Sequence, residues 1–134
     1  GRPQQPVWMA GEAPGGLSLE DVLRLQRELY AAFSDDEFQA KLEDVEARVG
    51  KAYVKYTSEH TKLFLSIQDT ILPKYGFAEG QKGVLQMMRD VSRFNGNELF
   101  EQNRVELNRL IGLAPEPEQE EARQAELRRK FLPQ

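Results

Sequence analysis

Apolar residues recur every three or four positions along most of the chain, which is the spacing of one buried helix face. The first such stripe follows Ser18, whose hydroxyl is suited to accept from a free N–H of a first helical turn, with Asp21 at the capping-box position. This pattern predicts a helix over 19–33. No segment alternates apolar and polar residues as a half-buried strand does, so the predicted class is all-α.

A second helix is predicted to start at the capping box of residues 34–37, with Ser34 as the N-cap. Its stripe continues in register past Gly50 until Pro73, which cannot continue a helix. One bent helix over 36–72 and two helices separated at Gly50 are equally compatible with the pattern. The stripe consists of Phe38, Leu42, Val45, Val49, Tyr53, Tyr56, His60, Leu63, Ile67 and Ile71.

Two further amphipathic segments follow a Tyr75-Gly76-Phe77 turn. The first runs from Val84 to Phe94, and the second begins at Asn97, a good N-cap, and closes at Gly112. The chain is therefore predicted to form a small bundle of four to five helices.

The two ends of the chain differ in composition from its centre. Residues 1–16 are rich in Pro and Gly and are expected to form a flexible, extended arm. Residues 17–113 are expected to form the helical domain. Residues 114–134 begin as a Pro-containing acidic linker and continue as a charged tail helix with a thin apolar face.

Several short runs between Leu17 and Leu113 occur together in a known family. They are Ala32-Phe33-Ser34, the segment 37–42, the segment 67–71, Lys74-Tyr75-Gly76-Phe77, Gly83-Val84-Leu85 and the segment 110–113. With them, the span 17–113 resembles the Protein C-ten family, small eukaryotic helical proteins of poorly defined biochemical role. The resemblance implies a helical domain and a free cytosolic regulator, and it supplies no catalytic residues.

Composition limits the classes of function. The 134 residues suffice for one domain, and 40% hydrophobic content suffices for a core. A net charge of −4 argues against binding to nucleic acid, which requires clustered basic residues. The chain has no Cys and one His, so neither a metal site nor another cofactor is expected. No apolar run is long enough to cross a bilayer, so no transmembrane segment is predicted.

Candidate catalytic groups have simpler interpretations. The acidic cluster 35–37 fits a helix N-terminus, and the cluster 43–46 fits a solvated helix face. His60 lies on the apolar stripe, where a hydrogen-bonded histidine at the core edge is expected. The glycines at 76, 80 and 83 lack the strand and the Gly-Lys-Ser/Thr of a phosphate-binding loop. The prediction is therefore that the protein is not an enzyme.

The predicted function is that of a non-catalytic helical protein–protein interaction module, an accessory or structural subunit of a larger assembly. An aromatic surplus surrounds the Tyr-Gly-Phe turn, and both arms carry apolar residues that one small domain cannot fully bury. Trp8, the single tryptophan, is expected either to dock on a partner or its own domain, or to be incidental. The predicted partner-binding residues are Trp8, Tyr75, Phe77, Phe131 and Leu132.

Three alternatives remain open at this point. The first is a free cytosolic regulatory adaptor. The second starts from the absence of Met before Gly1, as in a processed plastid or mitochondrial protein. It would be an extrinsic subunit bound peripherally to a membrane complex such as a photosystem. The third is an enzyme or small-ligand carrier with a cavity inside the bundle, for which His60 and the tyrosines are the available polar groups.

Overall fold

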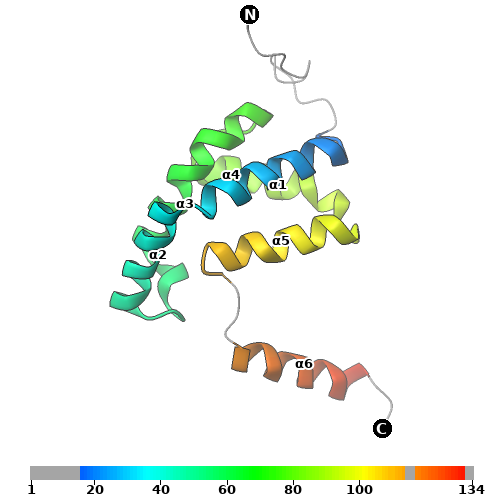
Figure 1. The fold of residues 1–134 in the computed structure, drawn as a ribbon. Coiled ribbons are helices and arrows are strands. Elements are labelled where there is room, and N and C mark those ends of the chain that lie inside the picture. Colours follow the sequence, from blue (N-terminus) through cyan, green and yellow to red (C-terminus); the bar gives the residue numbers. More distant parts are fainter. Residues whose placement is uncertain (1–15, 114–116, 132–134) are drawn as a thin grey trace, which may run out of the picture.

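The structure, a computed structural model, describes residues 16–113 and 117–131. All regular elements in these two ranges are helical, so the all-α prediction is confirmed (Figure 1). The α-helices are α1 (Leu19–Phe33), α2 (Asp36–Val49), α3 (Ser58–Ile71), α4 (Gly80–Val91), α5 (Glu98–Leu110) and α6 (Pro117–Phe131). Short 3-10 turns are η2 (Val54–Tyr56), η3 (Leu72–Tyr75) and η4 (Ser92–Phe94).

Helix α1 lies at the centre of the bundle and packs against both α3 and α5. It begins as predicted, because the Ser18 hydroxyl accepts from the backbone N–H of Asp21 at 3.1 Å. Its apolar stripe is buried and forms the middle of the core. Burial of a side chain of this size contributes about 2 kcal/mol. The buried apolar side chains of α1 are Val22, Leu25, Leu29 and Phe33.

The turn between α1 and α2 differs from the prediction by one residue. Ser34 has helical dihedral angles, and its N–H donates to the Tyr30 carbonyl at 2.9 Å, so it ends α1. The extended residue that caps α2 is Asp35, whose carboxylate accepts from the N–H groups of Glu37 and Phe38. The assignment of Ser34 as the N-cap is therefore wrong, because that residue still belongs to the preceding helix.

Two helices, not one, occupy the span 36–72. Gly50 adopts φ +91°, a conformation that favours glycine, and ends α2. Thr57 starts α3, since its hydroxyl accepts from the His60 N–H at 3.1 Å. The stripe therefore loses its register between the two helices, and Tyr53 and Tyr56 are exposed instead of buried. Val54, fully buried, fills the core position there.

The Tyr-Gly-Phe turn connects α3 to α4 and packs closely on α4. Gly76 adopts φ +90° at the end of η3. The N–H of Gly80, the first residue of α4, donates to the Asp69 carboxylate of α3 at 2.7 Å. Gly83 leaves no room for a side chain, because a Cβ there would lie 2.6 Å from the Ala78 carbonyl carbon and closer still to its oxygen. Glycine is therefore required at residue 76 by the backbone dihedral angle and at residue 83 by the close approach of the Ala78 backbone.

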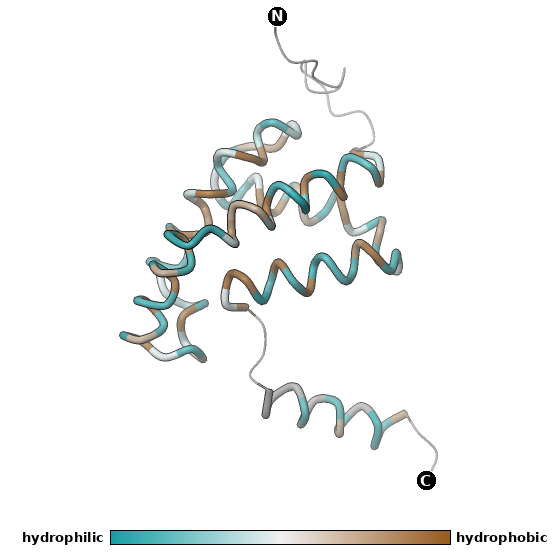
Figure 2. Tube along the Cα trace, viewed as in Figure 1, coloured by the Kyte–Doolittle hydropathy of each residue, from teal (hydrophilic) through white to brown (hydrophobic). Residues whose placement is uncertain are grey.

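Helix α5 is attached to α1 by polar contacts as well as by packing. Asn97 caps it as predicted, accepting from the Phe100 N–H at 3.0 Å. The Gln26 amide donates to the Phe100 carbonyl at 3.2 Å and accepts from the Asn103 amide at 3.0 Å. Helix α6 is drawn apart from α1–α5 in Figure 1, and its described part is mainly hydrophilic in Figure 2.

Candidate apolar docking groove

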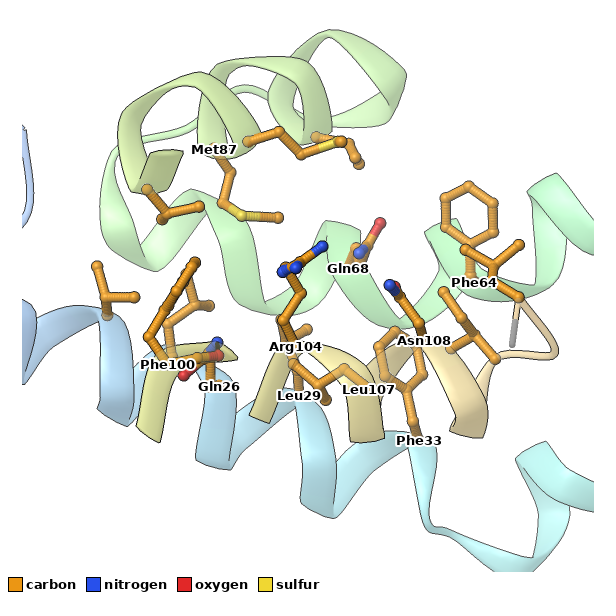
Figure 3. A pocket seen from close by; sticks show the side chains of 17 residues that line it. Gln26, Leu29, Phe33, Phe64, Gln68, Met87, Phe100, Arg104, Leu107 and Asn108 are labelled. Carbon is orange, nitrogen blue, oxygen red and sulfur yellow. Dashed lines mark hydrogen bonds between the residues drawn. The ribbon is translucent and has the colours of Figure 1, made fainter. Parts of the chain in front are cut away.

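A hollow of about 340 Å³ lies between α4 and α5 (Figure 3). It exists because α4 packs mainly on α3 while α5 packs mainly on α1, so these two helices form walls over a floor of α1 and α3. We call this hollow the α4–α5 groove. Its lining residues are Val22, Leu25, Gln26, Leu29, Phe33, Phe64, Gln68, Val84, Met87, Met88, Val91, Phe100, Arg104, Leu107, Asn108, Ile111 and Leu113.

The groove is continuous with the hydrophobic core. Its floor includes Leu25 and Leu29, the same α1 side chains that form the middle of the core. The α4 wall carries two neighbouring methionines, Met87 and Met88, and Met88 is 56% exposed. Methionine is flexible and polarisable, and it adapts to apolar partners of different shape. The groove is therefore suited to an apolar side chain supplied from outside α1–α5.

Three polar side chains interrupt this apolar surface. Gln68 of α3 is buried, and its Oε1 has no hydrogen-bond partner among the described residues. Arg104 of α5 lies over the groove in Figure 3 and pairs with Glu101 at 2.5 Å. Asn108, one turn further along α5, also lines the groove. A buried acceptor without a donor costs about 1–3 kcal/mol, so a ligand bringing one N–H or O–H group would recover that loss at Gln68.

His60 secures the C-terminal end of α5 beside the groove. The ring is buried, and its Nε2–H donates to the Ile111 carbonyl at 2.5 Å. The ring also meets Phe64 edge-on at 5.3 Å between centroids. The prediction of a hydrogen-bonded histidine is therefore confirmed, and its partner is a residue that lines the groove.

The residues predicted to bind a partner fall in different places. Tyr75 is buried in the turn before α4, and Phe77 of the same turn is half-buried against the core. Phe131, at the end of α6, is 75% exposed. Trp8 and Leu132 lie outside the described residues. The structure thus places Tyr75 and Phe77 together in one turn, while Phe131 belongs to another element.

Tyr75 takes part in a small polar cluster with Glu28 of α1 and Lys74. Its hydroxyl donates to the Glu28 carboxylate at 2.7 Å, and Lys74 donates to the same carboxylate at 3.0 Å. Burial, together with this hydrogen bond, raises the pKa of Tyr75 well above its ordinary value. Partial burial acts to raise the pKa of Glu28, but the hydrogen bonds from Tyr75 and Lys74 outweigh it and lower that pKa. The cluster fixes the start of the Tyr-Gly-Phe turn on α1.

Sequence reasoning did not identify the polar residues of the groove. Gln68, Arg104 and Asn108 come from two helices that are distant in the chain, and no spacing rule connects them. The one available indication was the Met87-Met88 pair on the predicted amphipathic face of α4. Methionine at the edge of such a face is typical of adaptable binding surfaces.

Within residues 16–113 and 117–131, no group of three or more His, Asp or Glu side chains is placed to hold a metal ion. No helix in the same ranges has both the length and the apolar character needed to cross a membrane.

Comparison with known proteins gives one match. The family model described as Protein C10 matches residues 18–99, which run from the N-cap of α1 into the first turn of α5. The matched stretch therefore contains α1–α4 and covers more than half of the chain. No curated protein and no solved structure matches it.

Proposed function

Since the chain belongs to the Protein C10 family, whose model spans residues 18–99, we propose that it is a non-catalytic helical protein-interaction module. Its docking surface is the α4–α5 groove, which receives an apolar segment of a partner protein. The groove is the observation that carries this proposal. The apolar surface of its walls is only partly buried, and Met88 on the α4 wall remains accessible.

The chemistry of the groove favours a protein segment as the partner. Apolar side chains of a partner helix or strand fill such hollows as anchors, and a methionine wall accommodates them. Polar groups around the hollow then fix the orientation of the anchor, a role available to Arg104 and Asn108 on α5. The Protein C10 match covers α4 and only the first turn of α5.

The exposed surface of helix α6 favours one form of this proposal, in which the interaction module is an accessory subunit of a larger assembly. Its described side chains are mostly exposed, including the aromatic Phe131. A helix that is polar nearly all round gains little stability from packing on its own domain. A neighbouring subunit that contacts Phe131 would supply the missing stabilisation.

A charge placed on the groove wall tests the proposal. Met88→Lys puts an ammonium group at the groove, whereas Leu85→Lys puts the same group on α4 at a site that does not line it. Met88 and Leu85 are 56% and 55% exposed, so the two substitutions are matched in their effect on folding. Tagged full-length variants would be recovered natively from the source cells, and co-purifying proteins quantified by mass spectrometry.

We expect a partner recovered in stoichiometric amount with the wild type and with Leu85→Lys, and reduced at least several-fold with Met88→Lys. Partners in scattered substoichiometric amounts that still depend on Met88 would favour the free regulatory adaptor over the accessory subunit. Equal recovery with both lysine variants would exclude the groove as the docking surface.

A further inference from the structure

The chain that precedes α1 is held against the end of α4. Leu17 is buried, its N–H donates to the Asp90 carboxylate at 2.9 Å, and Arg93 donates to the Leu17 carbonyl oxygen. Gly16 adopts φ +98°, and a side chain there would collide with both Asp90 and Arg93. Val91, which follows Asp90 in α4, lines the α4–α5 groove. The arm of residues 1–15 therefore starts at one end of that groove.

We infer that the Val7-Trp8-Met9 segment of the same chain occupies the α4–α5 groove in the free protein, with the Trp8 side chain between α4 and α5. A partner would then bind only by displacing this segment. The inference rests on the proposed function in one respect, since it takes the groove to be the docking surface. Residues 7–9 lie outside the described part of the chain, but their sequence, the number of residues between them and Gly16, and the chemistry of the groove favour this occupancy.

The length of the arm permits this occupancy. Gly16 is the eighth residue after Trp8, and eight residues of extended chain span up to about 26–29 Å. Helix α4 has 12 residues and is therefore about 18 Å long. Starting beside Asp90, the arm can reach any point along the α4 wall without disturbing the contacts of Leu17.

Tryptophan matches the three distinctive groups of the groove better than any other residue type does. Its indole N–H is a donor for the buried Gln68 Oε1, which has no partner among the described residues. Its ring offers a π-face to the Arg104 guanidinium, and tryptophan is the aromatic residue preferred by such cations. The Met87 side chain points into the groove in Figure 3, and thioethers make favourable contacts with aromatic rings. A volume of about 340 Å³ suits one bulky side chain and its flanking residues.

Trp8 is the single tryptophan of the chain, so its fluorescence reports its surroundings directly. The emission maximum and the acrylamide quenching constant would be measured for the full-length wild type, Met88→Lys and Leu85→Lys. Each protein would be compared with itself unfolded in urea, and circular dichroism would confirm that both variants retain the helical fold.

For the native wild type we expect a blue-shifted emission and a quenching constant several-fold below that of the unfolded chain. Met88→Lys should move both values most of the way to those of the unfolded chain, and Leu85→Lys should leave them unchanged. Wild-type emission equal to that of the unfolded chain would overturn the inference. So would a blue shift that Met88→Lys leaves intact, since Trp8 would then be buried elsewhere.

Dilution distinguishes this occupant from a second copy of the chain. An intramolecular contact gives an emission maximum that stays constant on serial dilution, as we expect. A blue shift that disappears on dilution would assign the groove to the segment of a second copy and refute the inference. The proposed function is judged separately by partner recovery. Loss of a partner in Met88→Lys without a Trp8 blue shift would uphold the function alone, and a Met88-dependent blue shift without any Met88-dependent partner would uphold the inference alone.

Discussion

Replacement of Gly83 in α4 by alanine has two opposite effects on stability: it creates a steric clash, and it improves helix propensity. A Cβ at residue 83 would lie 2.6 Å from the carbonyl carbon of Ala78 and closer to its oxygen, where about 3.4 Å is needed. The obstacle is backbone, so no side-chain rotation can relieve it. Either the turn before α4 or α4 itself must move by more than about an ångström to relieve the contact with that oxygen. That turn is held by the Gly80 N–H bond to Asp69 and by the Ala78 N–H bond to the Gln86 amide.

The two contributions to the free energy of unfolding have different sizes. Overpacking that displaces backbone costs up to about 3 kcal/mol. Alanine in a helix interior is favoured over glycine by about 1 kcal/mol. We therefore expect Gly83→Ala to lower the free energy of unfolding by about 2 kcal/mol. For a chain of this length that loss corresponds to a decrease in Tm of about 8 °C.

Urea and thermal unfolding followed by circular dichroism would measure this loss. The control is Lys82→Ala, an exposed neighbour in the same helix, which changes helix propensity slightly and meets no obstacle. We expect Lys82→Ala to unfold within about 0.5 kcal/mol of the wild type. A Gly83→Ala protein as stable as the wild type, or more stable, would show that the turn does not pack on α4 as described.

Four further substitutions test individual contacts. Asp35→Ala should lower the free energy of unfolding in urea by about 1 kcal/mol, because Asp35 caps α2. Ser34→Ala should leave it unchanged or raise it, because the buried Ser34 hydroxyl has no partner among the described residues. A larger loss with Ser34→Ala than with Asp35→Ala would show that Ser34 is the N-cap after all. His60→Phe should cost about 2 kcal/mol by leaving a buried carbonyl without its donor, and an unchanged stability would contradict that hydrogen bond. The stability advantage of the wild type over Glu28→Gln should be complete above pH 4.5 and should disappear as the pH falls through the lowered pKa of Glu28. A difference independent of pH, measured by unfolding at pH 7, 4.5 and 3, would refute that last expectation.

Local rules predicted the helices well where a cap and an apolar stripe agreed. The range of α1 was predicted to the residue, and Asn97 was identified as the cap of α5. Phe33 and Phe38, which flank the turn between α1 and α2, are in contact, with ring centroids 5.1 Å apart. These features depend on residues within one or two helical turns of each other, so the sequence contains the information that determines them.

The rules failed where the outcome depends on distant parts of the chain. The stripe of 36–72 kept helical register across Gly50, so periodicity could not decide between one helix and two. The structure departs from helix there because α3 must turn back to pack on both α1 and α2, which exposes Tyr53 and Tyr56. The groove is a clearer case, since it depends on the separation of α4 and α5, which no local pattern encodes.

Among α1–α5, the most extensive helix pair joins the first helix of this set to the last, because α5 packs along α1. During synthesis, α1 therefore emerges well before the helix that covers much of its apolar stripe. At roughly 5–20 residues per second, the ribosome needs roughly 4–16 s to advance from Phe33 to Leu110. Until α5 is complete, α3 is the main helix available to cover the α1 stripe that contains Leu25 and Leu29. We therefore expect truncation before α5 to leave apolar surface of α1 uncovered and the product prone to aggregate.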